Sequence, residues 1–239
     1  MQLSKRLKTA ADFVTSGNTV ADIGCDHAYI SIYLAGHNIA RHVIAMDINE
    51  GPLARARENI LRYGMQDRIE TRLSDGIKAL ECGEAETLFL AGMGGGLMIR
   101  ILEGNRAVTE QAGELILQPQ SEIEAVRRWI HRNGFAIQDE GMLMEDGRYY
   151  TVIKAEKLQD RHNDAYPKRC QYLFGRILLE REDSCLRQYL YDQEKKYRFI
   201  LKQMERNGSE DSRQRFQEIK EEYGHILEAE AYYGPAAVR

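Results

Sequence analysis

The first two thirds of the chain alternate short apolar runs with stretches of helical spacing. Nearly continuous apolar strands between amphipathic helices are typical of a parallel sheet that is covered on both faces. We therefore predict an α/β fold with a parallel sheet of five strands. The expected strands are residues 19–23, 42–47, 69–73, 87–91 and 114–118.

Two longer extended runs, 135–145 and 148–154, follow the parallel strands and are joined by Asp146-Gly147. Asp-Gly between extended runs is a strong signal for a two-residue β-hairpin. The sheet is therefore expected to end with an antiparallel pair. This ending resembles the Rossmann-like sheet of class I methyltransferases, and dehydrogenase-type nucleotide domains normally lack it; the resemblance concerns the fold alone.

Beyond residue 160 the spacing becomes helical. Apolar positions step by four and three residues from Leu186 to Met204 and again from Phe216 to Ile226, with a break at Asn207-Gly208-Ser209. Heptad spacing on both arms predicts a C-terminal α-helical hairpin that packs as an antiparallel coiled coil. We expect two domains, a Rossmann-like domain over 1–157 and a helical coiled-coil domain over 158–239.

Charge and composition exclude several classes of protein. A net charge of −4 argues against a chain that coats nucleic acid non-specifically, although a local basic stripe stays possible. No run approaches the roughly 20 apolar residues of a membrane span, and the N-terminus lacks a secretory apolar run. We expect a cytoplasmic protein without a membrane segment. Its cysteines lie far apart without a Cys-x-x-Cys pair, which indicates reduced thiols and no metal site: Cys25, Cys82, Cys170 and Cys185.

The turn after the first strand is the most informative segment, Asp22-Ile23-Gly24-Cys25-Asp26-His27-Ala28-Tyr29. Gly24 allows the main chain to approach a ligand, but the later glycines of the dinucleotide fingerprint are missing. Those glycines accommodate a pyrophosphate, so an acidic, bulkier loop favours a cofactor without phosphates, such as S-adenosylmethionine. We expect Asp22, Ile23 and Gly24 to bind it. A simple helix cap would explain Asp26, but not Asp22 together with Gly24.

Two further loops supply candidate cofactor contacts. Asp47 ends the second strand, where a carboxylate commonly holds ribose hydroxyls, and Ile48 follows it. Asn49 is the better candidate to cap the next helix, which leaves Asp47 for the ribose. Asp75 and Gly76 follow the third strand, where an adenine would lie. Asp75 could accept from the adenine amine, or it could merely cap a helix.

A glycine-rich loop, Gly92-Met93-Gly94-Gly95-Gly96, follows the fourth strand. It is not a P-loop, because it has no lysine, and it lacks the Asn-Pro-Pro-aromatic run of enzymes that methylate exocyclic amines. Four glycines in five positions would let the main chain approach a flat ring, whereas a structural turn needs only one or two. We therefore expect Gly92 at the cofactor and Met93, Gly94 and Gly95 at the substrate.

Together these loops resemble the bacterial tRNA (adenine(22)-N(1))-methyltransferase family. The similarity spans essentially the whole chain and includes Leu3-Ser4-Lys5-Arg6-Leu7 and Gln118-Pro119-Gln120. The family pattern has Asn at the position of Gln120, and Leu-Pro at the position of Ile30-Ser31. The resemblance implies S-adenosylmethionine as methyl donor and N1 of a tRNA adenine, position 22, as acceptor. It also implies that Gln118 and Gln120 contact the substrate.

The chemistry of that reaction suits the loop residues. Adenine N1 has an available lone pair, so alignment and stabilisation of the ring cation matter more than a strong base. A carboxylate near the base, Asp26 or Asp22, could offset this charge. We take Asp26 and His27 as the catalytic residues. His27 could position the base or the methionyl group, or it could have no role at a helix start.

Basic side chains on two helices are candidate tRNA contacts: Lys5 and Arg6 near the N-terminus, and Lys195 and Lys196 in the helical hairpin. The alternative is a solvated coiled-coil surface with interleaved acids such as Glu194 and Glu205. We expect a monomer whose coiled coil contacts tRNA. Competing hypotheses are a methyltransferase with another RNA or small-molecule acceptor, and a non-catalytic module whose coiled coil binds a protein.

Overall fold

The computed structural model describes residues 3–159, 165–206 and 213–234. The chain divides into two compact units, residues 1–165 and 166–239. The last strand of the first unit ends at Lys157, where the sequence suggests a domain boundary; that exact boundary stays a prediction.

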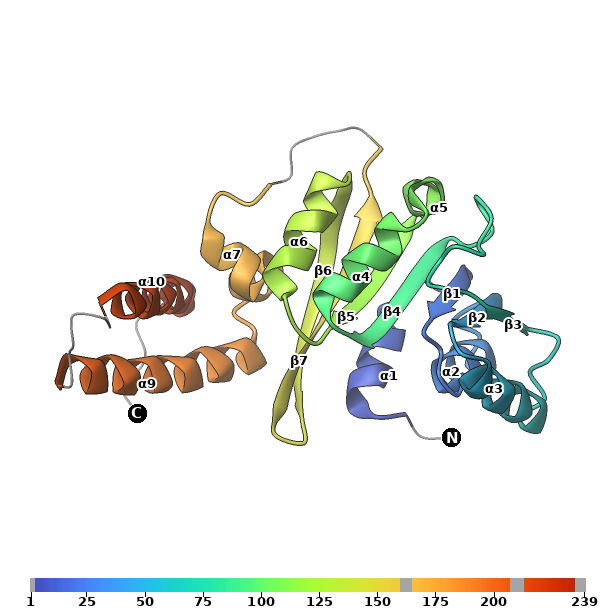
Figure 1. Ribbon diagram of the computed structural model, residues 1–239, viewed down its shortest axis with the longest axis horizontal. Helices are drawn as coiled ribbons and strands as arrows, with labels where there is room; N and C mark the ends of the chain where they lie inside the picture. Colours follow the sequence, from blue (N-terminus) through green and yellow to red (C-terminus); the bar gives the residue numbers. More distant parts are fainter. Residues whose placement is uncertain (1–2, 160–164, 207–212, 235–239) are drawn as a thin grey trace. The chain divides into compact units, whose positions relative to one another are not determined.

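The first unit is built on a seven-stranded sheet of order β3-β2-β1-β4-β5-β7-β6 (Figure 1). The first five strands in this order are parallel, β7 is antiparallel to β5, and β6 is antiparallel to β7. This confirms the predicted class I methyltransferase sheet. The strands are β1 (Thr19–Ile23), β2 (His42–Asp47), β3 (Ile69–Leu73), β4 (Thr87–Met93), β5 (Glu114–Pro119), β6 (Phe135–Glu145) and β7 (Arg148–Lys157).

The turn between β6 and β7 has the predicted hairpin geometry. Asp146 and Gly147 have φ values of 50° and 73°. Positive φ at both central residues is typical of a type I′ turn, whose twist matches that of the two strands. The hairpin completes the sheet before the chain leaves the first unit.

Helices cover both faces of the sheet (Figure 1). One core joins α1, α2 and α3 to the strand residues that face them, such as Val20, Phe89 and Val152, all of them buried. On the other face α4 packs against α5 and α6. The helices of this unit are α1 (Lys5–Asp12), α2 (Tyr29–Gly36), α3 (Glu50–Arg62), α4 (Gly95–Glu103), α5 (Arg106–Gln111) and α6 (Ile123–Arg132).

The second unit is helical in its described part, as predicted. Its two long helices pack together. Tyr197 is hydrogen-bonded to Glu222 and Glu194 to Tyr223, so the residue numbers rise along one helix where they fall along the other. The helices are therefore antiparallel. The predicted break at 207–209 lies outside the described residues. The elements are α7 (Arg169–Phe174), α8 (Arg176–Glu180), α9 (Ser184–Arg206), α10 (Arg213–Glu230) and the short η2 (Ala231–Tyr233).

Two properties of the described residues bear on possible functions. Within them, no helix has the length and apolar character needed to cross a membrane. The same residues contain no group of three or more His, Cys, Asp and Glu side chains arranged to hold a metal ion. All four cysteines are free thiols, and Cys25 and Cys170 are buried.

Candidate functional site

A pocket of about 280 Å³ opens at the carboxyl ends of β1 and β4 in the first unit. In open α/β sheets, ligands bind at this end of the strands, where the order of the strands reverses. Here β1 has β2 on one side and β4 on the other, which is such a point. The residues that the sequence singles out and that line the pocket are Arg6, Asp22, Gly24, Asp26, His27, Gly92 and Met93.

The loop after β1 is a tight turn in which the backbone at Gly24 has a conformation that favours glycine. Gly24 has a φ of 73°, and a Cβ there would lie 2.2 Å from Cε of Met93. The main-chain N–H groups of Gly24 and Cys25 both donate to the carbonyl of Met46, at 2.8 and 2.9 Å. The loop is thereby fixed to the end of β2, which positions Asp26 and His27 beside the pocket.

Asp22 is a buried carboxylate at the base of this pocket, with 4% of its surface exposed. Its Oδ2 accepts a hydrogen bond of 2.6 Å from the hydroxyl of Ser31, which is fully buried. Burial raises the pKa of Asp22 to about 6, although the hydrogen bonds from Ser31 oppose this shift. Asp22 therefore loses a proton near neutral pH in surroundings that disfavour an uncompensated negative charge.

Asp26 and His27 form a pair at the rim of the pocket. The Asp26 side chain is largely exposed, and its Oδ1 lies 3.6 Å from Nε2 of His27. Nδ1 of His27 is buried and has no hydrogen-bond partner among the described residues. If Nε2 carries the proton toward Asp26, Nδ1 is an acceptor without a partner. Such an orphaned atom at a pocket is a natural contact for a ligand donor.

Asp47 is tied to the main chain on both sides. Its carboxylate accepts from the N–H groups of Asn49, at 2.9 Å, and of Asp26, at 3.3 Å. Asn49 occupies the N-cap position of α3, but its side chain makes no capping hydrogen bond. The Asp47 carboxylate instead binds main-chain N–H groups here, so it is less available to a ligand than the sequence suggested. Ile48 beside it is 60% exposed and offers an apolar surface near the pocket.

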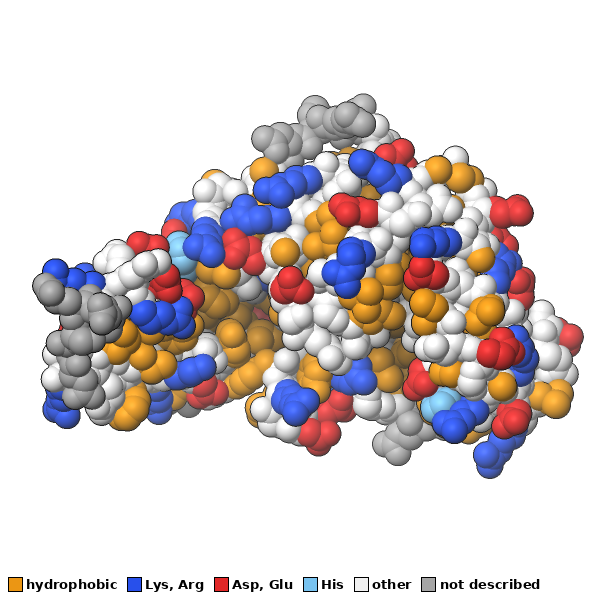
Figure 2. All heavy atoms as spheres, in the orientation of Figure 1, with side chains coloured by type: hydrophobic (Ala, Val, Ile, Leu, Met, Phe, Trp, Pro, Cys, Tyr) orange, Lys and Arg blue, Asp and Glu red, His pale blue; other side chains and the backbone are white. Residues whose placement is uncertain are grey.

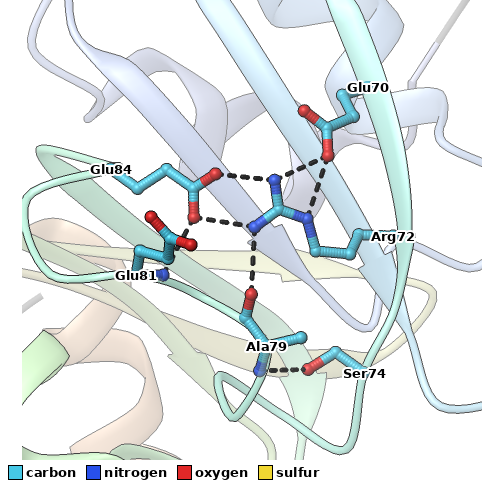
Figure 3. Close-up of polar contacts among 6 residues, drawn as sticks. All are labelled: Glu70, Arg72, Ser74, Ala79, Glu81 and Glu84. Carbon is cyan, nitrogen blue, oxygen red and sulfur yellow. Dashed lines mark hydrogen bonds and ion pairs between the residues drawn. The ribbon is translucent and has the colours of Figure 1, made fainter.

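The loop after β3 is fixed by a polar network that the sequence pattern does not reveal (Figure 3). The guanidinium of Arg72 pairs with Glu70 and Glu84 and also donates to the carbonyl of Ala79 at 3.0 Å. The hydroxyl of Ser74 donates to the carbonyl of Gly76 and accepts from the N–H of Ala79.

The two sequence candidates in this loop differ in their surroundings. Asp75 is exposed and forms an ion pair of 2.5 Å with Lys78. Gly76 has a φ of 63°, which a glycine adopts at little cost. Arg72 on β3 thus fixes the loop through the carbonyl of Ala79, while the Asp75 side chain stays at the surface.

The glycine loop after β4 packs mainly against protein. A Cβ at Gly95 would lie 2.6 Å from the carbonyl oxygen of Ser121, and one at Gly96 would lie 2.9 Å from the Glu122 carboxylate. A Cβ at Gly94 would lie 3.1 Å from the Ser121 hydroxyl. These three glycines therefore allow close contact with the loop before α6. Gly92, with a φ of 79°, instead faces Arg6 and Gln120.

Arg6 lines the pocket, whereas the sequence predicted that it contacts tRNA through its positive charge. Its Nη1 donates to Oε1 of Gln118 at 3.1 Å, and its guanidinium lies 5.7 Å from the centroid of the Tyr150 ring. Gln118 is fully buried, and its Nε2 has no partner within the described part of the chain. The orientation of this amide follows from Arg6, which has only donors. The helical start of the chain thereby contributes to the site.

The remaining substrate candidates are more exposed. Lys5 extends from the surface while its main-chain N–H donates to Glu145. Gln120 is exposed and its N–H donates to the carbonyl of Met93 at 2.8 Å. Its side chain lies beside Gly92. No local sequence pattern predicts the main-chain contact with Met93 that joins these two loops.

Lys195 and Lys196 are exposed on α9 in the second unit. The ammonium of Lys195 lies 4.0 Å from the centroid of the Tyr191 ring. Glu194 is not one of the solvated acids expected there. It is 7% exposed in the seam between α9 and α10, where it contacts Arg198 and accepts from the Tyr223 hydroxyl. Figure 2 shows basic, acidic and apolar side chains interleaved on the visible face of this unit.

Residues 3–153 match the family described as "Methyltransferase domain". The chain therefore belongs to this class, which agrees with the sheet, its final hairpin and the position of the pocket.

Closer relatives define the family more narrowly. The tRNA (adenine(22)-N(1))-methyltransferase of Bacillus subtilis (strain 168) is 38% identical over 156 residues, which are 65% of this chain and 66% of that protein. That alignment spans slightly less than two thirds of the curated relative.

Solved structures extend the similarity to nearly the whole chain. The B. subtilis M1A22 tRNA methyltransferase TrmK is 31% identical, with a TM-score of 0.84 over 95% of this chain and 98% of that one. M. capricolum TrmK, solved with S-adenosyl-homocysteine, is 25% identical, with a TM-score of 0.83 over 97% and 99% of the two chains. The chain is a member of the TrmK-type tRNA (adenine(22)-N(1))-methyltransferase family.

Proposed function

We propose that this protein transfers the methyl group of S-adenosylmethionine to N1 of adenine 22 in tRNA. The observation that carries the proposal is the likeness to TrmK over both units of the chain. The pocket supports it independently, because the carboxylates of Asp22 and Asp26 line it and no phosphate-binding loop is present among the described residues that line it.

The residues of the pocket fit S-adenosylmethionine. Its methionyl end carries an ammonium and a sulfonium, which suit the carboxylate of Asp22. Asp47 and the exposed Ile48 are proposed to hold the ribose and the adenine ring, with Asp75 and Gly76 beyond them. Ile23 and Gly24 provide main chain at the turn, and Gly92 provides it across the pocket. When bound, the cofactor supplies an electrophilic methyl group.

The reaction then needs alignment more than base catalysis. The lone pair of adenine N1 forms the new N–C bond, while the electrons of the S–C bond return to sulfur, so the positive charge moves to the adenine ring. We infer that Asp26 offsets this charge. His27 is proposed to accept a hydrogen bond from the exocyclic amine through its unpartnered Nδ1. Asp26 would hold the ring of His27 in the required tautomer.

The acceptor base is proposed to lie against the loops after β4 and β5. Met93, Gly94 and Gly95 form one side, and the amides of Gln118 and Gln120 form the other. Arg6 supports this side through its hydrogen bond to Gln118. The base must leave its stack to reach the site unless its local tRNA structure already exposes it.

Lys195 and Lys196 are proposed to contact tRNA phosphates, together with Lys5. Each phosphate contact contributes to the salt dependence of binding. Changing Lys195 and Lys196 to Ala should weaken tRNA binding and reduce its salt slope, and affinity measured at several salt concentrations tests this. An unchanged slope would favour a solvated surface or a protein contact. Lys78→Ala, which removes a cation from the first unit, is a matched control.

We propose that the methyltransferase domain ends near Lys157 and that the helical domain follows. The fragment 1–157 should fold and bind S-adenosylmethionine, because the hairpin of β6 and β7 completes the sheet. It should methylate tRNA poorly. The full chain is proposed to act as a monomer, which sedimentation tests. Since its substrate would be tRNA, we expect it in the cytoplasm.

The decisive experiment is methyl transfer from labelled S-adenosylmethionine to total tRNA, followed by nucleoside mapping. We expect 1-methyladenosine at position 22. A label at another nucleotide, or in small molecules, would favour the alternative acceptors. Cofactor binding without any transfer to RNA would favour a binding module whose coiled coil contacts a protein. An Asp26→Asn variant, with its cofactor affinity measured, controls for trace contaminating enzymes.

A further inference from the structure

The hydroxyl of Ser31 is bonded directly to the carboxylate at the base of the pocket. It donates to Oδ2 of Asp22 over 2.6 Å, and the two residues are 0% and 4% exposed. A hydrogen bond between two such buried groups is held in a single geometry, because neither partner can exchange it for water.

The position of Ser31 in α2 gives this contact a second component. The helix begins at Tyr29, and its N-cap residue, Ala28, has no side chain that could cap it. The first N–H groups of a helix have no partner within the helix. The main-chain N–H of Ser31 is one of these groups, and like the hydroxyl it lowers the pKa of Asp22.

We propose that Ser31 is a positioning residue, whose hydroxyl holds the Asp22 carboxylate in the orientation that receives the ammonium group of S-adenosylmethionine. This inference rests on the proposed function, since it concerns the same pocket. Ser31 itself does not line the pocket, whereas Asp22 does. Its effect on the cofactor is therefore exerted through Asp22.

A negative group, Asp47, acts on Asp22, and the hydroxyl of Ser31 opposes its effect. Asp47 on β2 raises the pKa of Asp22, and Asp22, Asp47 and Asp26 all raise the pKa of Cys25. The other charged or titratable groups that line the pocket are Arg6 on α1, Cys25, Asp26 and His27 in the loop, and Tyr29 at the start of α2. Arg6 is already bonded to Gln118, and His27 faces Asp26. The hydroxyl of Ser31 is thus the donor that favours the charged form of Asp22.

The test is the affinity for S-adenosylmethionine measured by calorimetry between pH 5 and 8.5. The wild-type affinity should fall as the pH drops through about 6, where Asp22 gains its proton. Ser31→Ala removes the hydroxyl and should move this midpoint upward by about one to two pH units, the equivalent of a hydrogen bond to a charged group. Ser31→Pro places the residue of the family pattern at this position, also lacks the hydroxyl, and should move the midpoint in the same direction.

Two further variants separate positioning from simple loss of stability. Thr87→Val removes another buried hydroxyl that donates to a buried carboxylate, Glu114, at 2.8 Å, near the opposite end of the sheet. It should lower the melting temperature and leave the pH midpoint unchanged. Ser31→Cys retains a weaker donor and should give a midpoint between those of the wild type and Ser31→Ala. If Ser31→Ala does not fold, the midpoint of Ser31→Cys, which should lie above that of the wild type, is the test.

The outcomes are distinct. A Ser31→Ala midpoint equal to that of the wild type, or a loss of affinity that is the same at every pH, would overturn the role of Ser31. A shift caused by Thr87→Val would overturn it as well. If the wild type does not bind S-adenosylmethionine at any pH, the proposed function itself fails. Normal wild-type binding with unchanged variants refutes only the inference about Ser31.

Discussion

Two buried carboxylates in the same sheet have very different surroundings. Glu114, at the start of β5, is 3% exposed and accepts from the Thr15 hydroxyl at 2.5 Å and its N–H at 3.1 Å. It also accepts from the Thr87 hydroxyl and pairs with Lys154 at 2.8 Å. Asp22, at the end of β1, has the Ser31 hydroxyl as its side-chain partner.

The difference separates an architectural charge from a charge kept for a ligand. Burial of Lys154 disfavours its charge, but the hydrogen bond and ion pair with Glu114 raise its pKa above the ordinary value. Glu114 is therefore compensated within the protein, and it joins the segment after α1 to two strands. Asp22 has no cationic partner among the described residues and is acted on by Asp47, so we infer that a bound cation completes its compensation.

The largest expected effect is that of Glu114→Ala on stability. The substitution removes the nearer of the two carboxylates beside the Lys154 ammonium, which is 17% exposed, and leaves Glu156 at 3.5 Å. Breaking a buried ion pair costs about 3–5 kcal/mol of unfolding free energy. Chemical denaturation measures this loss, while the folded fraction should bind S-adenosylmethionine with unchanged affinity. A strong loss of cofactor affinity in the folded variant would remove the distinction between the two carboxylates.

The next effect concerns turnover. Asp26→Asn retains the shape of an exposed side chain and removes the charge proposed to offset the ring cation. We expect kcat to fall by about 10²–10³, the usual loss for one electrostatic contact made in the transition state. Cofactor affinity by calorimetry should stay close to that of the wild type. Normal turnover, or failure to bind the cofactor, would exclude this role.

Asp22→Asn should stabilise the apoprotein while it weakens cofactor binding. The pKa of Asp22 rises from 3.8 to about 6 on folding, so between these pH values the folded state holds a proton that the unfolded state releases. Wild-type stability therefore falls as the pH rises through this window, by at most about 3 kcal/mol. The variant lacks this loss, so its advantage in denaturation should grow from pH 4 to 6 and then stay constant. An advantage independent of pH would show that the proton on Asp22 is not its cause.

The alternation of apolar runs predicted the fold well because burial on both faces leaves a strong pattern. The strands 19–23 and 42–47 match β1 and β2, and the Asp146-Gly147 turn was recognised from local chemistry alone. The short helices α7 and α8 were missed, since six and five residues are too few to show a helical period.

The candidate site was predictable only where function depends on local sequence. The turn at Gly24 and the acidic positions after each strand follow from the chain order of a parallel sheet. The hydrogen bond between Arg6 and Gln118 joins residues 112 positions apart, and the Arg72 network depends on a loop that returns to β3. Such contacts follow from tertiary packing, for which the sequence carries no periodic signal.

The smallest of these effects tests the ribose contact. Asp47→Ala should lose about 1.5–3 kcal/mol of S-adenosylmethionine binding, the usual contribution of hydrogen bonds to a charged group. The carboxylate also holds the N–H groups of Asn49 and Asp26, so part of the loss would come from a looser loop. Asp47→Asn, which keeps one acceptor oxygen, should retain the loop and lose less, and S-adenosylhomocysteine should be affected equally because it has the same ribose. Asp12→Ala, which removes an exposed carboxylate paired with Lys8, is the matched control. Calorimetry that finds Asp47→Ala and Asp12→Ala alike would leave Asp22 as the pocket carboxylate that binds the cofactor.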